Sequence, residues 1–446
     1  MSASVTSSGS APAAPRALRV AVCVPSLAPL RQMLEDGHAV DGTYVVQGYI
    51  AAGLRARGHR LTFLARREPG DIECGLDPGE PRIVPRTWST RLWFRLASSS
   101  AWRLQRRLGV PYLNVFSNVR LTDACLRCLP GHDVVYERNA LYDLGVARAS
   151  RRLGLPYVMF FEADQVMELE YTGRSLPRLL RWRAGQVLRY NLKAADCIIC
   201  VSEPARAHLL STWGADPRKV VVCRNGVDVG RFRPDPETRA KMRRTLGLDG
   251  CPLVVFTGSF FEWHDVATLL DAFALVRART GDARLVLAGD GRTLESMKRR
   301  AQAAGLAKAV QFTGLMPHTE IPQLLSAADV AVAPYPRTEQ VLWLSPLKLF
   351  EYMASGAAIV ASDAGQVREV IRHASNGLLV PPGDAPAMAA AIEKLTIDAE
   401  LRGRLGAQAR QDAVHEHSWE RYIDRLEAVF GAVIERSHSS GSVLGD

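Results

Sequence analysis

Short apolar runs recur along the whole chain, and between them lie segments in which apolar residues repeat at helical spacing. The runs fall at residues 19–25, 60–64, 133–136, 156–161, 197–201 and 220–223, and then at 252–257, 284–288, 310–312, 330–333 and 358–361. Brief apolar runs bounded by turn residues are typical of buried parallel strands. Their alternation with helical segments predicts an α/β fold in which helices cover parallel sheets.

The length of 446 residues and the hydrophobic fraction of 47% predict two domains with full cores. Segment 226–236 is rich in glycine, proline and charge, which is typical of a linker. We therefore predict a disordered tail at 1–16, an N-terminal domain at 17–225, the linker at 226–236, a C-terminal domain at 237–417, a helix at 418–436 and a polar tail at 437–446. After the first strand we expect a long polar loop containing Asp41, Gly42 and Thr43, then a helix over 44–57.

The net charge of +10 favours an anionic partner, such as nucleotide phosphate, an acidic membrane face or nucleic acid. The basic residues match no recognised nucleic-acid-binding motif, so we expect no nucleic-acid partner. No apolar run is long enough to span a bilayer, and the N-terminal tail lacks the apolar region of a signal peptide. These features predict a cytoplasmic protein.

Two segments combine tryptophan with many arginines, at 87–108 and 174–193. Basic amphipathic helices of this kind can lie on an anionic bilayer, which would place the protein at the inner face of the cell membrane. The alternative is a solvated helix face with the tryptophans in the core.

Eight cysteines include two pairs at CxxC spacing, Cys125 with Cys128 and Cys197 with Cys200. Such pairs can bind zinc. However, Cys197 and Cys200 lie in an apolar run, and alternation along a strand would direct them to opposite faces. We therefore expect core packing, with no metal site and no disulfide.

Residues 345–356 form the most informative segment, a short loop that becomes a helix. A helix N-terminus offers free N–H groups and a partial positive charge, which suits phosphate. Glu351, one turn beyond Lys348, can accept two hydrogen bonds from a sugar diol. Phosphate at one end and ribose at the other would describe a nucleotide site. The alternative is an ordinary helix with a solvated lysine and glutamate.

Further motifs follow in a fixed order along the chain. They are Asp41-Gly42-Thr43, Arg57-Gly58-His59, Val201-Ser202-Glu203, Asn225-Gly226-Val227-Asp228, Thr257-Gly258-Ser259-Phe260, Ala288-Gly289-Asp290-Gly291, Phe312-Thr313-Gly314, Pro334-Tyr335 and Phe350-Glu351-Tyr352-Met353-Ala354-Ser355-Gly356. Each motif alone is weak, but the ordered set, from about residue 17 to 435, resembles the GT-B fold glycosyltransferases. The resemblance is strongest to the retaining enzymes of family 4, of group 1 type.

The resemblance implies two Rossmann-like domains that face a cleft, with a last helix that crosses back to the first domain. It implies a metal-independent hexosyltransferase that moves a sugar, with retention, from a UDP- or GDP-linked donor to a hydroxyl acceptor. No cofactor is expected beyond this co-substrate. The tryptophan- and arginine-rich helices suggest a lipid-linked or cell-surface glycan acceptor, as in polysaccharide or glycolipid biosynthesis.

On the donor side, the resemblance implies that Glu351 binds the ribose and that the preceding loop lies near the phosphates. The other donor-binding residues that it implies are Ser345, Pro346, Leu347, Gly258, Ser259, Gly291 and Gly314. Many family members carry a glutamate where this chain has Trp343, and an Arg/Lys pair where it has Ser259 and His264. We hypothesise that Lys348, assisted by His264, supplies the missing positive charge at the diphosphate.

On the acceptor side, the resemblance points to Glu162, which would position or deprotonate the acceptor hydroxyl together with Asp164. Gly42 and Thr43 belong to the glycine loop, and Glu137 and Arg138 follow another strand, where we expect them to face the cleft. An ion pair between Arg138 and a nearby carboxylate is an equal alternative. The alternative functions are a GT-B-fold sugar-nucleotide epimerase and a non-catalytic nucleotide-sugar-binding protein.

Overall fold

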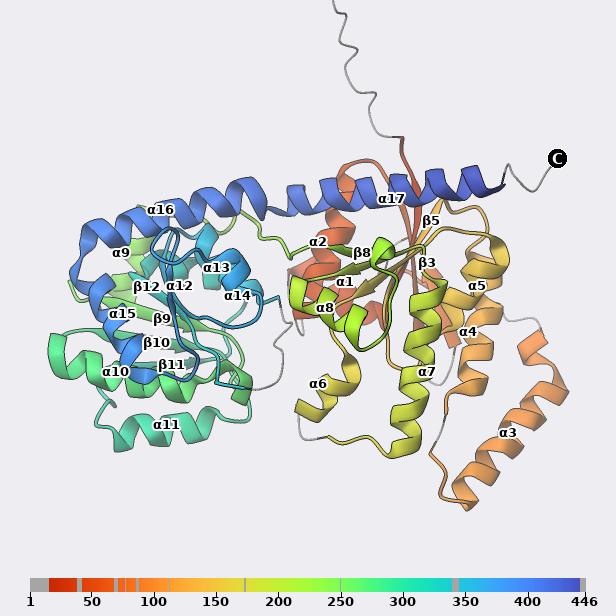
Figure 1. The fold of residues 1–446 in the computed structure, drawn as a ribbon, viewed down its shortest axis with the longest axis horizontal. Helices are drawn as coiled ribbons and strands as arrows, with labels where there is room; N and C mark the ends of the chain where they lie inside the picture. Colours follow the sequence, from red (N-terminus) through yellow and green to blue (C-terminus); the bar gives the residue numbers. More distant parts are fainter. Residues whose placement is uncertain are drawn as a thin grey trace, which may run out of the picture.

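The computed structural model describes residues 16–37, 42–67, 71–76, 78–85, 88–111, 113–171, 174–248, 250–338 and 345–441. Most of the predicted N-terminal tail, Asp41 and Trp343 lie outside the described residues. The chain forms two sheets, each covered by helices, which lie side by side in Figure 1. The predicted α/β class is confirmed.

The N-terminal sheet has the strand order β4-β3-β2-β1-β5-β6-β7-β8. Its parallel strands are β1 (Arg19–Cys23), β2 (Arg60–Arg67), β5 (Val134–Arg138), β6 (Tyr157–Phe161), β7 (Cys197–Cys200) and β8 (Val220–Val222). Two antiparallel strands, β3 (Asp71–Gly75) and β4 (Arg82–Ile83), extend one edge. Both were missed, because a half-exposed edge strand carries no continuous apolar run.

The C-terminal sheet is parallel throughout, in the order β11-β10-β9-β12-β13-β14. Its strands are β9 (Leu253–Thr257), β10 (Arg284–Ala288), β11 (Val310–Gly314), β12 (Val330–Ala333), β13 (Ala358–Ser362) and β14 (Leu378–Val380). Consecutive residues of β9 alternate between two apolar clusters, with Val254 and Phe256 in one and Leu253 and Val255 in the other. The sheet is therefore buried on both faces, as continuous apolar strands require.

The helices of the N-terminal part are α1 (Leu27–Asp36), α2 (Gly42–Ala56), α3 (Leu92–Arg107), α4 (Val115–Cys128), α5 (Gly145–Leu153), α6 (Gln165–Tyr171), α7 (Arg178–Ala194) and α8 (Glu203–Ser211). Those of the C-terminal part are α9 (Pro236–Thr245), α10 (Val266–Thr280), α11 (Leu294–Ala303), α12 (Ile321–Ala327), α13 (Leu347–Ala354), α14 (Val367–Val370), α15 (Ala385–Ile397) and α16 (Ala399–Glu416). The expected long polar loop after β1 is wrong, because α1 occupies much of it. Leu27, Leu30 and Met33 are its buried residues, at a spacing that indicates one helix face.

The last helix, α17 (Trp419–Gly441), crosses back and lies along the N-terminal sheet domain (Figure 1). Its buried side chains, including Ile423 and Phe430, belong to the same core cluster as β1 and β5. A Cβ on Gly53 of α2 would lie 2.6 Å from Ile423, so only glycine allows this close helix contact. The crossing helix was predicted correctly, but its predicted end at 436 is too early.

The two places where the chain passes between the domains are hydrogen-bonded to each other. Val227 N donates to His417 O at 2.8 Å, and Trp419 N donates to Val227 O at 3.2 Å. A Cβ on Gly226 would lie 2.8 Å from the Trp419 ring. The predicted linker and the start of α17 therefore form one joint, and we propose the division into domains at 225/226 and 417/418 on this basis.

Candidate active site

Helix α13 begins at the domain interface with its first turn uncapped. Pro346 occupies the N-cap and provides no side-chain hydrogen bond, and Ser345 Oγ has no partner in the described chain. Asn225 Nδ2 donates to Ser345 O at 3.1 Å, which ties this loop to the end of the N-terminal domain. The predicted loop and helix are confirmed, and the helix start leaves N–H groups for an anion.

Lys348 occupies the first turn of α13, with 8% of its surface exposed. Its Nζ has no hydrogen-bond partner in the described chain and lies 4.3 Å from the centre of the Phe256 ring. A Cβ on Gly258 would stand 2.7 Å from this nitrogen, so the amine lies directly beneath the Gly258 loop. Burial lowers the pKa of Lys348 to about 7. A buried amine without a protein partner is the pattern expected at a site that binds an anion.

His264 lies beside this amine, close enough for the two to interact electrostatically. Burial holds the pKa of His264 well below its usual value, and the charge of Lys348 lowers it further. Its Nδ1 lies 2.6 Å from Ser259 O and 3.3 Å from Ser259 Oγ. The structure therefore brings together His264 and Ser259, the residues found where family members carry basic groups, around Lys348.

Glu351 lies one turn further along α13 and is 8% exposed. Its Oε1 is 2.7 Å from Nε2 of His318, a residue that the sequence reasoning missed. His318 follows Gly314 in the loop after β11, and its Nδ1 has no partner in the described chain. The signal was available, because this loop leaves a strand C-terminus at the same edge of the sheet as α13.

The glycine loops after β9 and β10 pack directly on each other. A Cβ on Gly289 would lie 1.9 Å from Gly258 O, and one on Gly291 would lie 2.4 Å from Phe260 O. Gly289 N also donates to Gly314 O at 2.9 Å, which joins the loop after β11. The predicted donor-side loops at Gly258, Gly291 and Gly314 therefore converge at one edge of the C-terminal sheet.

The predicted acceptor residues Thr43, Arg138 and Glu162 form one hydrogen-bonded group. Thr43 Oγ1 donates to Glu162 at 3.0 Å, and Arg138 approaches the same carboxylate at 2.9 Å. Arg138 Nη2 also reaches Thr43 Oγ1 at 3.3 Å. The alternative that Arg138 forms an ion pair is confirmed, with Glu162 as its partner.

Glu137 and Asp164 do not join this group. Successive residues of a strand point to opposite faces, so Glu137 points away from the face that Arg138 occupies. Glu137 is 4% exposed, it lies 2.5 Å from Tyr157 Oη, and burial raises its pKa to about 8. The expectation that Glu137 faces the cleft together with Arg138 is therefore wrong.

Asp164 instead lies just before α6 and holds two side chains. Its Oδ1 accepts from Val166 N at 3.1 Å, and its Oδ2 accepts from Trp213 Nε1 at 2.9 Å and lies 3.0 Å from His208 Nε2. With 2% of its surface exposed, Asp164 has a structural environment rather than an acceptor-binding one.

The acceptor group and helix α13 meet across the two domains. A Cβ on Gly42, at the start of α2, would lie 3.5 Å from Leu347 Cδ1, at the start of α13. Leu347 also packs against the core of the N-terminal domain. Thr43, next to Gly42, therefore places the Glu162 group close to the N-terminal end of α13.

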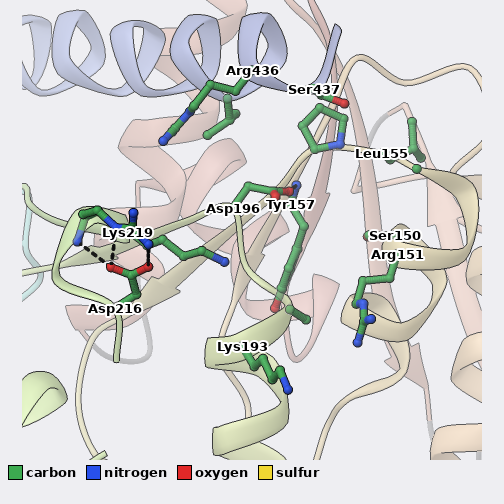
Figure 2. Close-up of a pocket in the computed structure, with 15 residues that line it drawn as sticks. Ser150, Arg151, Leu155, Tyr157, Lys193, Asp196, Asp216, Lys219, Arg436 and Ser437 are labelled. Atoms are coloured by element: carbon green, nitrogen blue, oxygen red, sulfur yellow. Dashed lines mark hydrogen bonds and ion pairs between the residues drawn. The ribbon is translucent and has the colours of Figure 1, made fainter. Parts of the chain in front are cut away.

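A cavity of about 630 Å³ lies elsewhere (Figure 2). Tyr157 and Lys219 on its wall mark the N-terminal ends of β6 and β8, the opposite edge of the sheet from Glu162. Lys219 Nζ donates to Ala195 O, and Asp216 is paired with Arg218. We do not assign the reaction to this cavity, because ligands of open α/β sheets bind at strand C-termini.

No group of three potential ligands that could hold a metal ion occurs in the part of the chain that the structure describes. Cys197 and Cys200 are buried in the core of the N-terminal domain, as expected. Within the same residues, no helix is long and apolar enough to cross a membrane.

Comparison with known families gives two matches that together cover most of the chain. Residues 40–231 match Glycosyltransferase Family 4, and residues 238–412 match Glycosyl transferases group 1. The fold and the site define a protein of the GT-B glycosyltransferase class. The chain belongs to the family-4, group 1 glycosyltransferases, as the ordered motifs predicted.

Individual relatives are distant. The chain is 31% identical to the alpha-D-kanosaminyltransferase of Streptomyces kanamyceticus, over 63% of this chain and 72% of that one. It is 29% identical to a GDP-mannose-dependent alpha-(1-6)-phosphatidylinositol monomannoside mannosyltransferase of Mycobacterium tuberculosis, over 54% of this chain and only 63% of the relative's length. The Anabaena protein HepE, solved with UDP and glucose, shares the fold with a TM-score of 0.65 and 18% identity, over 93% of this chain and 100% of that one.

Proposed function

We propose that this protein transfers a sugar from a nucleoside diphosphate sugar to a hydroxyl of a glycan or lipid-linked acceptor. The observation that carries the proposal is the unpartnered, buried amine of Lys348, one turn before Glu351 at the start of α13. The diphosphate would bind at this helix start, between Ser345 Oγ and Lys348, and the ribose would bind Glu351. Pro346 has no N–H to contribute.

The chemistry requires positive charge at the leaving group. The bond between the anomeric carbon and the diphosphate breaks, the diphosphate keeps the electron pair, and the acceptor oxygen bonds to the carbon while its proton passes to Glu162. Lys348 in its ammonium form and the N-terminus of α13 would stabilise the developing charge. His264 would assist only by holding the Ser259 loop in place, because burial and the charge of Lys348 keep its pKa well below the usual value and its ring neutral. Because these groups can provide this stabilisation, we propose that no metal is essential.

The acceptor would bind the N-terminal domain, where the Thr43–Arg138–Glu162 group lies near the start of α13. Glu162 would accept a hydrogen bond from the acceptor hydroxyl, while Arg138 holds the carboxylate in place. Retention at the anomeric carbon follows from the family resemblance and is part of the proposal.

Our proposals for the donor base and the acceptor class are based on the relatives. The mycobacterial relative takes GDP-mannose and a phosphatidylinositol mannoside by its name, and HepE was solved with UDP. We therefore propose a GDP- or UDP-linked donor and a lipid-linked acceptor, with the protein acting peripherally at the cytoplasmic face of a membrane.

The test is a thermal-shift screen with UDP, GDP and their sugars, followed by transfer assays on an acceptor panel. We expect one base to stabilise the protein selectively. Transfer should persist in EDTA, and NMR of the product should show the anomeric configuration of the donor. Conversion of the donor to a second sugar nucleotide without acceptor would identify an epimerase. Donor binding without any turnover would identify a non-catalytic binding protein.

A further inference from the structure

Helix α3 exposes large apolar side chains to solvent along most of its length. Leu92 is 69% exposed, Trp93 57%, Leu96 56% and Leu104 57%. Exposed large apolar side chains that gather on one element often mark an interaction surface. The alternative from the sequence, that these tryptophans lie in the core, is wrong for Trp93 and also for Trp102, which is 50% exposed.

The opposite face of α3 holds the helix on the domain. Phe94 is buried against Phe116 of α4, with ring centres 5.5 Å apart, and Arg120 Nη2 donates to Ser98 Oγ at 3.2 Å. At 3.6 residues per turn, Leu92, Leu96 and Arg103 lie on the side of the helix opposite Phe94. The exposed apolar face is therefore a consequence of how α3 is attached and is not a loosely packed end.

The first turns of α7 add to the same side of the molecule. Trp182 is 57% exposed and Leu179 is 38% exposed. Arg183 Nε donates to Leu113 O at 3.1 Å, which joins α7 to the segment between α3 and α4. In Figure 1, α3 and the beginning of α7 lie along the lower edge of the N-terminal domain, away from α17. We call the exposed residues of α3 and of 178–182 the docking face.

The charge of the docking face selects its partner. Neither α3 nor α7 contains an aspartate or glutamate. The arginines of α3 are Arg95, Arg103, Arg106 and Arg107. Tryptophan and leucine beside arginine suit the boundary between lipid headgroups and acyl chains, and the cationic groups suit acidic headgroups. A soluble polyanion would use the arginines but would leave the leucines in water.

We propose that the docking face binds an anionic lipid bilayer and so presents the acceptor-binding domain to lipid-linked substrate. This inference rests on the proposed function for its purpose but not for its geometry. Binding to vesicles depends only on the docking face, whereas nucleotide binding depends only on α13 and its neighbours.

The test is co-sedimentation of the full chain with vesicles of phosphatidylcholine alone and with about a third phosphatidylglycerol. We expect binding to the anionic vesicles only, weakened by salt because surface charge is screened. The double variant Trp93→Glu/Leu96→Glu should bind at least tenfold more weakly. The matched control is Ile397→Glu, which changes a side chain 69% exposed in the C-terminal domain and should bind normally.

A second pair of variants tests the charge of the docking face. Arg103→Glu/Arg107→Glu should lose vesicle binding, while Arg244→Glu/Arg299→Glu, with the same charge change in the C-terminal domain, should keep most of it. Each variant should keep the unfolding temperature of the unchanged protein, which shows that it is folded. Equal vesicle binding by the docking-face variants and their controls would overturn the proposal. So would stronger binding to RNA than to vesicles, or no vesicle binding by the unchanged protein.

If the protein binds vesicles but no nucleotide sugar, the proposed function is wrong and the proposal that the docking face binds a bilayer is still supported.

Discussion

The two halves of the candidate site differ in how far the protein satisfies its own polar groups. On the C-terminal domain, Lys348 Nζ, Ser345 Oγ and His318 Nδ1 have no partner in the described chain. On the N-terminal domain, Thr43, Arg138 and Glu162 hydrogen-bond one another. At a site that binds a diphosphate, polar groups without a protein partner can pair with the diphosphate when it binds. A site for a neutral hydroxyl needs only one oriented carboxylate.

The strongest test of this difference is Lys348→Met. Removal of one charge-stabilising donor should lower turnover by about 10²–10³-fold. Stability should stay the same or rise, because the variant no longer buries an amine without a partner. Turnover and thermal unfolding measured on the same preparation decide the matter. Near-normal turnover would show that the unpaired amine has no role in the reaction.

The acceptor side is tested by a pair of variants on neighbouring elements. Glu162→Gln should lower turnover by about 10²-fold, because the amide is a poorer acceptor for a hydroxyl proton. Glu137→Gln should leave activity nearly unchanged, since burial raises the pKa of Glu137 to about 8 and the acid is already largely protonated at neutral pH. Equal losses in both variants would mean that the comparison reflects domain stability alone.

His318→Ala tests whether His318 contributes to donor binding through Glu351. Loss of the hydrogen bond to Glu351 should raise the KM for donor about tenfold with little change in kcat. This change corresponds to the free energy that one hydrogen bond to a charged group contributes. His318→Gln, which can still donate a hydrogen bond, should recover part of the loss. An unchanged KM in His318→Ala would remove His318 from the ribose site.

The smallest effect expected is on pH dependence. Lys348 has a pKa of about 7 in the folded protein, below its value in an unfolded chain, and an anionic donor favours the protonated form. Donor affinity should therefore weaken by about fivefold from pH 7 to pH 8. The same shift means that the unfolded chain binds more protons above pH 7, so Lys348 makes stability rise from pH 7 toward pH 10. Calorimetry across this range, with Lys348→Met as the control, should show both trends lost in the variant.

Much of the fold could be predicted from sequence, because buried parallel strands are continuous apolar runs. The strand at 284–288 was predicted at its observed limits, and the C-terminal crossing helix was recognised. Strands β3 and β4 and helix α1 were missed, since exposed edge strands and short helices carry weaker patterns. The docking face was anticipated from composition, but only the structure shows which tryptophans are exposed.

The site was less predictable than the fold. Motif order located α13, the glycine loops and Glu162, but it could not show that Glu137 is buried beneath the face that Arg138 occupies. His318 was missed because its partner Glu351 is 33 positions away in the chain. Pairs of this kind depend on tertiary contacts, which no local spacing encodes.

The joint between the linker and α17 has a mechanical consequence. Because Val227 is hydrogen-bonded on both sides of the break between α16 and α17, the chain's two crossings cannot slide past each other. Any opening of the two domains would then be a rotation about this one joint, with the parts furthest from it moving most. A bulkier residue in place of Gly226 would clash with the Trp419 indole and restrict rotation at this joint, without a change to any residue of the candidate site.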